Sequence, residues 1–428
     1  MPADRPLHPL AIPLRASRSG ARRHARARFH LLRPLLVAVA AWGCGEGGSA
    51  PGDTAFADSA GITIATASGD GWSVEDGWRL EPDLTIGDVS GELSFGRIAS
   101  VAPAPGGRIY VLDRQSQLVH VFDADGKRLL EFGGEGGGPG EFQRATQLFP
   151  VGDDRLAVAE GFPPTLHWLT AEGSFLRTFR LDPESGAESQ AATFAAWAVL
   201  PSGELFAHVA HFSPQTMENP ESLLLRIHEE APPDTLAPIP QNLFSAMRGE
   251  IRMFEPRWVW TIGRDGSYWL SGGMPYEVRG YGPEGALSLV LRRSAPSVVV
   301  TDEIEGRVLE QMREQMAAGG APQAAIDQML GRVVFEPEVP QVLRLWASEP
   351  DEHLWVGVPT ADAIKADATG VGAYDVFARD GRFVGRIAAP EGFALHVVTA
   401  DAVYGVWKDE LDVQYARRYR IVRPGKES

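Results

Sequence analysis

The chain repeats a four-strand unit, and this repetition restricts its fold more than any other feature of the 428-residue sequence. In residues 98–134, an apolar run, a Pro-Gly-Gly turn, two short strands and an Asp-Ala-Asp-Gly turn lead to a last strand at 128–132. Short strands separated by turn residues are typical of an antiparallel meander. Similar units of about 36–48 residues follow at 145–181, 194–240, 258–293, 341–388 and 393–422.

Six such units predict an all-β fold, a closed β-propeller of six four-stranded antiparallel blades. The last unit lacks an outer strand, and the segment 61–86 before the first unit can supply it. Both chain ends would then complete one blade and remove an open sheet edge. Seven blades are the alternative if 61–88 forms more than one strand. An array of β-sandwiches fits the shared four-strand plan less well, and the Gly-His…Trp-Asp pattern of WD40 repeats is absent.

Residues 301–338 interrupt the strand pattern and predict a small helical insertion between the fourth and fifth blades. Asp302 with Glu305 indicates a capping box, and Gly319 with Gly320 ends the first helix. Pro322 can open a second helix. Apolar residues recur at helical spacing in the first helix, at Ile304, Val308, Leu309, Met312 and Met316. We interpret the insertion as packing against the ring, with a lid over one mouth of the ring as the alternative.

Two motifs carry a resemblance to a known family. The run 132–142 (FGGEGGGPGEF) resembles a linker of six-bladed propellers related to NHL repeats, and 405–415 (GVWKDELDVQY) is similar to a closing motif of bacterial six-bladed-propeller lipoproteins. Asp-Gly turns within the blades, such as Asp125-Gly126, fit the same group. The resemblance covers about residues 59–424 and implies architecture; it implies no particular activity.

The N-terminal residues predict export. Residues 1–43 carry a basic segment, a short apolar core at 35–42 and then small residues, which is the order of a secretory signal. Residues 41–44 (AWGC) resemble a lipobox, which implies lipidation at Cys44; a signal cleaved without lipidation is the alternative. The segment 44–58 has the composition of a flexible tether, and the propeller is expected over 59–424. We therefore expect an extracytoplasmic, membrane-anchored lipoprotein, in the outer membrane or periplasm of a host with two membranes.

The charge of the chain excludes one class of partner. The formal net charge is −16, and residues 44–428 contain 32 basic and 55 acidic residues. Nucleic-acid binding needs a basic surface, so we expect no nucleic-acid partner, and we expect membrane contact only through the lipid anchor. The single cysteine, Cys44, excludes a disulfide framework and a cysteine-based zinc site.

The sequence supports no particular cofactor. His208 and His211 are three residues apart in a predicted strand, where their side chains would face opposite sides, so we predict no metal there. The architecture is similar to that of six-bladed lactonases, which hold calcium with Glu, Asp and Asn. This chain has two Asn, Asn219 and Asn242, so that ligand set cannot be carried over. We predict no cofactor, with a carboxylate calcium site left open. No Gly-x-Ser-x-Gly elbow supports a serine hydrolase.

Two clusters of aromatic and charged residues are candidates for a binding surface, because interfaces are enriched in aromatic residues and arginine. The first lies before the fourth blade and contains Arg252, Glu255, Arg257, Trp258 and Trp260. The second lies in the last unit and contains Trp407, Asp409 and Glu410. The alternative interpretations are a buried strand with a charged rim for the first cluster and a turn held by side-chain hydrogen bonds for the second.

These observations favour a binding or scaffold module of the cell envelope whose ligand is an envelope protein, a peptide or a glycan. The alternative is a metal-dependent hydrolase or lyase with its site in the central channel, built from scattered carboxylates. An enzyme should have convergent polar side chains with shifted pKa values deep in the channel. A binding module should have exposed aromatic side chains on one face of the ring.

Overall fold

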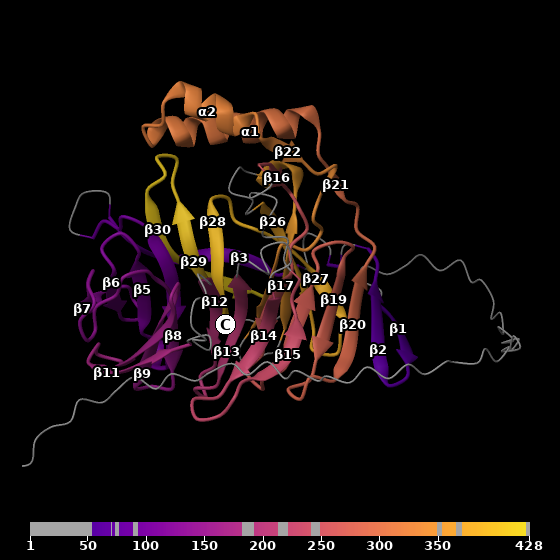
Figure 1. Ribbon diagram of the computed structural model, residues 1–428. Helices are drawn as coiled ribbons and strands as arrows, with labels where there is room; N and C mark the ends of the chain where they lie inside the picture. Colours follow the sequence, from indigo (N-terminus) through magenta and orange to yellow (C-terminus); the bar gives the residue numbers. More distant parts are fainter. Residues whose placement is uncertain are drawn as a thin grey trace, which may run out of the picture.

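The computed structural model describes residues 54–69, 71–72, 77–88, 93–181, 192–212, 221–240, 249–348, 353–364 and 370–424. Six β-sheets stand around a common axis as the blades of a propeller (Figure 1). The prediction of an all-β propeller with six blades is therefore confirmed. Cys44 and the signal peptide expected at 1–43 lie outside the described residues.

The first three blades are antiparallel sheets of four strands in chain order. Blade one contains β4 (Ile98–Pro103), β5 (Ile109–Asp113), β6 (Leu118–Phe122) and β7 (Arg128–Gly133). Blade two contains β8 (Ala145–Val151), β9 (Arg155–Gly161), β10 (Pro164–Thr170) and β11 (Phe175–Arg180). Blade three contains β12 (Ala192–Val199), β13 (Leu205–Phe212), β14 (Glu221–Ile227) and β15 (Asp234–Pro238). Short loops suffice between strands because antiparallel neighbours need no crossover.

The other three blades use the same plan, and blades four and six also contain strands from the N-terminal segment. Blade four contains β17 (Val259–Ile262), β18 (Tyr268–Ser271), β19 (Glu277–Tyr281) and β20 (Leu287–Arg293), extended by β2 (Ile62–Ala67) and β1 (Thr54–Ser59). Blade five contains β24 (Arg344–Ala347), β25 (Leu354–Pro359), β26 (Val371–Phe377) and β27 (Phe383–Ala388). Blade six contains β28 (Phe393–Val398), β29 (Ala402–Lys408), β30 (Gln414–Val422) and β3 (Arg79–Ile86).

The two ends of the chain close the ring in blade six. Strand β3 pairs antiparallel with β30, so that Glu81 lies opposite Arg420 and Leu84 lies opposite Arg418. This pairing supplies the outer strand that the last sequence unit lacks, as the sequence predicts. The side chain of Arg418 also binds Asp83 across the pair, with Nε 3.0 Å from Oδ1.

The segment 54–67 differs from the prediction. Residues 54–58 were expected within the flexible tether, but they belong to β1, which pairs antiparallel with β2. Strand β2 pairs parallel with β20 of blade four, so this segment adds to an existing blade and forms no seventh one. Ala65 and Ala67 of β2 are both 1% exposed in the apolar core between blades four and five, which explains why the segment docks there.

Apolar side chains hold each blade against the next. Six buried clusters lie one at each junction between successive blades, including the junction between blades six and one. At that last junction, Ile86 of the closing strand packs with Ile98, Val111 and Phe122 of blade one. Full burial of one such side chain contributes roughly 1.5–3 kcal/mol relative to exposure. Ring closure therefore seals the core between blades six and one and also completes a sheet.

The first strand of each blade lies at the axis, where β4, β8, β17, β24 and β28 contact their neighbours around the ring. Side chains of one blade bind backbone N–H groups of the next. Gln414 accepts from Ile98 N–H and Gln117 accepts from Ala145 N–H, both at 2.8 Å. His396 Nδ1 accepts from Val101 N–H at 3.1 Å. These side chains satisfy donors that have no strand partner on the channel side, where an unpaired buried group is costly.

The predicted helical insertion is present between blades four and five. Helices α1 (Asp302–Ala318) and α2 (Gln323–Leu330) lie over one end of the ring, above the β29–β30 hairpin in Figure 1. Helix α1 is capped by the hydroxyl of Thr301, which accepts from Ile304 N–H, one residue before the predicted capping box. Gly319 ends α1 as predicted. Ile304 and Val308 are buried against Phe254, in agreement with the packing interpretation of the insertion.

Short strands connect the insertion to the ring. Strand β16 (Ile251–Met253) pairs parallel with β22 (Val333–Phe335), and β21 (Val298–Val299) pairs antiparallel with β23 (Glu338–Val339). The connection that enters blade four at 249–258 is thereby tied to the segment that follows α2. We call this end of the ring the helical face.

A prediction concerns the pH dependence of stability. Desolvation, with a smaller effect of Arg344, lowers the pKa of His396 to about 4, so the native side chain stays neutral at pH 5. The unfolded imidazole, with its ordinary pKa near 6.5, binds a proton there, so stability falls as the pH falls from about 6.5 to about 4. We expect His396→Asn, whose amide oxygen can still accept from Val101 N–H, to reduce the loss of unfolding free energy between pH 7 and pH 5 by roughly 2 kcal/mol.

Urea unfolding followed by tryptophan fluorescence at the two pH values measures this difference. All other titrating groups are common to both proteins, so the comparison isolates His396. An equal loss in the variant and the natural protein would show that His396 is not the group responsible.

Candidate functional site

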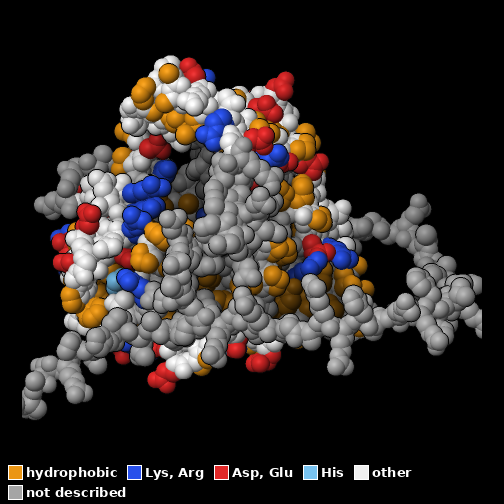
Figure 2. Space-filling view, viewed as in Figure 1, with side chains coloured by type: hydrophobic (Ala, Val, Ile, Leu, Met, Phe, Trp, Pro, Cys, Tyr) orange, Lys and Arg blue, Asp and Glu red, His pale blue; other side chains and the backbone are white. Residues whose placement is uncertain are grey.

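A cavity of about 310 Å³ opens on the helical face, and we call it the rim pocket. Three connections line it: the segment 252–259 that enters blade four, the segment 339–344 that enters blade five, and Ile364 with Gly370 between β25 and β26. In an antiparallel blade, the entry to the first strand and the connection from the second to the third strand lie at the same end. The three connections therefore meet at one mouth of the ring. Figure 2 shows the molecule hollowed below the helical pair, with Lys and Arg side chains beside the hollow.

Four of the five residues in the first predicted cluster line the rim pocket together. These are Arg252, Glu255, Arg257 and Trp258. Trp260 lies two residues further along the chain, in β17, and its ring meets that of His208 edge to face at a centroid distance of 6.4 Å. Trp258 and Trp260 both pack against the apolar core between blades three and four, as expected for residues that share a strand face. Both tryptophans are half-buried, so the alternative interpretation, a buried strand with a charged rim, describes the two equally.

The guanidinium groups of the rim pocket differ in their surroundings. Arg252 binds Glu336 at 3.1 Å and Glu250 at 3.0 Å, and these two carboxylates raise its pKa above the ordinary value. Arg257 is exposed and makes no ion pair with any residue in the described part of the chain. Arg344, the first residue of β24, also lines the pocket. The pocket thus gathers three arginines around one acidic residue, Glu255.

One side of the rim pocket is apolar. Val342 and Ile364 are each 1% exposed, and Val339 is 2% exposed. Leu343 and Met253 complete this wall, and Met253 belongs to the same core as helix α1. A hydroxyl or amide placed against such a wall would lose its water without gaining a hydrogen bond. The geometry suits a ligand with one apolar group and a negative charge.

The second predicted cluster has a different arrangement. Asp409 accepts from the backbone N–H groups of Leu411 and Val413 and from the hydroxyl of Tyr415, so it holds the β29–β30 turn. Trp407 donates from Nε1 to Glu391 O at 3.1 Å and lies under the Arg417 guanidinium. The turn interpretation therefore describes Trp407 and Asp409. Glu410 is exposed in the same turn, which also lies on the helical face.

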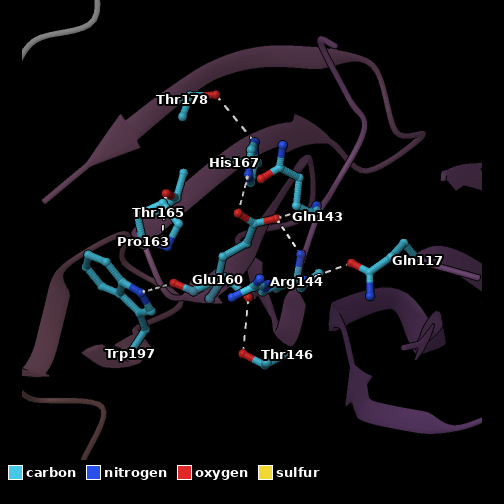
Figure 3. A network of polar contacts seen from close by, with 12 residues as sticks. Gln117, Gln143, Arg144, Thr146, Glu160, Pro163, Thr165, His167, Thr178 and Trp197 are labelled. Atoms are coloured by element: carbon cyan, nitrogen blue, oxygen red, sulfur yellow. Dashed lines mark hydrogen bonds and ion pairs between the residues drawn. The ribbon is translucent and has the colours of Figure 1, made fainter. Parts of the chain in front are cut away.

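Blades one and two each contain a buried carboxylate near a histidine, and the two sites are 47 residues apart in sequence. Glu160 accepts from Gln143 N–H at 2.7 Å and Arg144 N–H at 3.0 Å, with His167 beside it (Figure 3). Asp113 accepts in the same way from Gly96 N–H and Arg97 N–H at 3.0 Å.

In both blades these carboxylates position the entry to the inner strand. Burial by itself would raise the pKa values of Asp113 and Glu160. The backbone N–H donors, joined by His167 at Glu160, outweigh this effect and lower both pKa values. Their repetition and their backbone partners indicate a structural role rather than catalysis.

Of the histidine pair singled out in the sequence, the structure describes the side chain of His208. His208 Nε2 lies 2.6 Å from Ser222 Oγ, and burial lowers the pKa of His208 to about 4. No group of three or more His, Cys, Asp or Glu side chains with metal-binding geometry occurs among the residues that the structure describes. In that same part of the chain, no helix is long and apolar enough to cross a membrane. A direct measurement of metal content tests the predicted possibility of a carboxylate calcium site.

An ionic cluster between blades four and five escaped the sequence analysis. Asp375 is fully buried, and both of its carboxylate oxygens accept from arginines: Arg386 Nε at 2.7 Å and Arg293 Nη1 at 3.1 Å. Tyr276 donates to Asp375 at 2.9 Å, and burial raises the pKa of this tyrosine. Arg293 also donates to Gly69 O in the segment after β2. The cluster joins two blades and the N-terminal segment, which gives it a structural role.

Comparison with known proteins supports the fold. The sequence model of a family described as 6-bladed beta-propeller matches residues 90–183, which span blades one and two. A search of curated proteins finds no match.

Solved structures with a similar arrangement have little sequence in common with this chain. One is a candidate exported protein of Bacteroides fragilis (10% identity, TM-score 0.47, covering 84% of this chain and 100% of that one). Another is a member of the DUF4221 family from Bacteroides vulgatus (8% identity, TM-score 0.47, covering 81% and 99%). Virginiamycin B lyase from Staphylococcus aureus is a third (9% identity, TM-score 0.43, covering 81% and 100%).

The buried ionic cluster generates a prediction. Asp375→Ala removes the acidic partner of Arg293, whose side chain is 2% exposed, and leaves its charge without compensation. We expect the free energy of unfolding to fall by about 3–5 kcal/mol, measured by urea unfolding. Arg264→Ala, an exposed arginine in the β17–β18 turn, should change it by less than about 0.5 kcal/mol.

A second substitution separates loss of charge pairing from loss of packing. Arg293→Met in the Asp375→Ala background removes the uncompensated charge and should recover part of the stability. Unchanged stability in Asp375→Ala itself would contradict the assigned role of the cluster.

Proposed function

We propose that this six-bladed β-propeller is an exported protein, anchored by a lipid at Cys44, that binds an envelope protein, peptide or glycan at its helical face. The observation that carries the proposal is the rim pocket, where Arg252, Glu255, Arg257 and Trp258 come together from one connection. Arginine and tryptophan are the residues most enriched among the energetically dominant contacts of interfaces. Export rests on the signal-like order of residues 1–43, and anchoring rests on the lipobox-like residues 41–44.

The buried titratable groups favour binding over catalysis. His208 has a hydroxyl partner, His396 accepts a backbone N–H, and Asp375 is enclosed by two arginines and a tyrosine. Each of these contacts is a structural one between strands or blades, and none places a nucleophile beside an open pocket. The helical face exposes arginines and aromatic rings, which suit recognition, beside the carboxylates of α1 and of Glu410.

A second feature of the helical face supports binding. Phe162, between β9 and β10, stacks on Phe194, in the first strand of blade three, with ring centroids 4.7 Å apart. The two residues are 38% and 45% exposed, respectively. Both stand at the end of the ring where inner strands begin. Exposed aromatic side chains at a mouth that also carries arginines are typical of an interaction surface.

Site-specific photo-crosslinking in living cells tests this proposal. A photoreactive phenylalanine analogue in place of Trp258 should form a covalent adduct with the ligand, whereas the analogue in place of Leu129 should not. Leu129 is a matched control because it is 49% exposed on the outer strand of blade one, away from the helical face. Absence of an adduct at 258, or equal adducts at both positions, would contradict binding at the rim pocket.

Charge reversal gives a quantitative version of the same test. Arg257→Glu places a negative charge among the pocket arginines and should reduce the yield of the 258 adduct at least tenfold. Arg264→Glu makes the same change of charge in the β17–β18 turn, at the opposite end of the blade, and should leave the yield within twofold. Circular dichroism melting of both variants checks that each is folded.

A further inference from the structure

Arginines stand at the entrances of four inner strands. Arg97 and Arg144 directly precede β4 and β8, Arg257 lies two residues before β17, and Arg344 is the first residue of β24. Because every inner strand begins at the same end of the ring, these residues lie around one mouth, on the helical face. The 47-residue spacing of Arg97 and Arg144 makes this a repeated feature of the blades.

The backbone at the first two of these positions is held in place. Asp113 accepts from Arg97 N–H at 3.0 Å, and Glu160 accepts from Arg144 N–H at 3.0 Å (Figure 3). Both carboxylates are buried and directed to the backbone, while the two arginine side chains are exposed. The arginines are therefore presented from a fixed strand entrance rather than from a loose loop.

Three of these arginines, Arg97, Arg144 and Arg257, make no ion pair with the described residues, although the chain is acidic overall. In the part of the chain that the structure describes, no carboxylate lies within 4.0 Å of the guanidinium of Arg97, Arg144 or Arg257. Other exposed arginines do pair, as Arg79 does with Glu81 at 2.8 Å and Arg177 with Glu229. Three positive charges without a carboxylate partner at one mouth are available to pair with an anionic ligand, although Glu255 and Glu410 lie on the same face.

We propose that the ligand of the helical face is an acidic peptide segment, with one apolar side chain in the rim pocket and carboxylates on Arg257 beside it and on Arg97 and Arg144 across the mouth. This inference rests on the proposed function and names its ligand class. Arginine binds carboxylates with two parallel hydrogen bonds, which makes such a rim selective for acidic side chains. Recognition of acidic motifs by arginine clusters is a recurring mode of peptide binding.

The walls of the rim pocket favour a peptide over an acidic glycan. Leu343 is partly exposed in the pocket, Val339, Val342 and Ile364 lie behind it at no more than 2% exposure, and none of the four offers a hydrogen-bonding side chain. Sugar hydroxyls against this wall would be desolvated without partners, at a cost of about 1–3 kcal/mol each. An aliphatic or aromatic side chain gains free energy from the same contact, and the volume of about 310 Å³ accommodates one such side chain with its backbone.

Selection from a phage-displayed library of random heptapeptides on the full-length protein tests the inference. We expect enrichment of sequences with two or more Asp or Glu residues around a Leu, Ile, Met or Phe. The binding constant of the most enriched peptide, measured by fluorescence anisotropy, should weaken at least tenfold in Arg97→Gln/Arg144→Gln. The same binding constant should differ by less than twofold between Arg264→Gln and the natural protein. Raising NaCl from 50 mM to 500 mM should also weaken it, because salt screens exposed charges.

Several outcomes would overturn the inference. Enrichment of basic or uncharged peptides, or no enrichment at all, excludes an acidic peptide as the ligand. Saturable binding of polygalacturonate that competes at the rim pocket, without peptide binding, would assign the site to an acidic glycan instead. The crosslinking at position 258 is independent of ligand class. An adduct there without acidic enrichment would retain the proposed function and reject only this inference, whereas no adduct would reject both.

Discussion

The pairing of β3 with β30 is the contact on which the other parts of the ring depend. It joins residues 79–86 to residues 414–422, so the last blade exists only when both ends of the propeller are in place. The same strand brings Ile86 into the core between blades six and one, so one interaction closes a sheet and buries an apolar face. A closed ring then keeps the entrances of all inner strands at one mouth. The rim pocket and the arginines around it are consequences of that closure.

Side chains that cross between blades determine the angle and spacing of the inner strands. Gln117, Gln414 and His396 each bind a backbone N–H of the following blade, and Asp375 joins blades four and five to the N-terminal segment. The inner strands carry donors toward the channel that have no ladder partner, so each such bond removes the cost of an unsatisfied group. The same polar residues that a search for catalytic groups would select are thus occupied in holding the ring together.

The candidate site was partly predictable. Arg252, Glu255, Arg257 and Trp258 stand out in the sequence because charged and aromatic residues alternate in a connection between two blades, and all four line the rim pocket. Trp407 and Asp409 stand out for the same compositional reason, yet they hold a turn. Composition cannot distinguish a residue that lines a pocket from one that holds a turn, because the difference depends on which backbone groups lie within hydrogen-bond distance of the side chain. The apolar wall from 339–343 and Ile364 was not predicted, since no periodic signal links those segments to residue 258.

The sequence by itself indicated six blades with seven as the alternative, the blade shared by both chain ends, and the helical insertion with its ends near Gly319 and Pro322. These features depend on local alternation, turn residues and helix caps, which act between residues close in the chain. Only the tertiary structure decided that β2 pairs with β20, that Arg293 and Arg386 share Asp375, and that four strand entrances bring arginines to one mouth. Those contacts join residues far apart in sequence, and only the packing of complete blades brings them together.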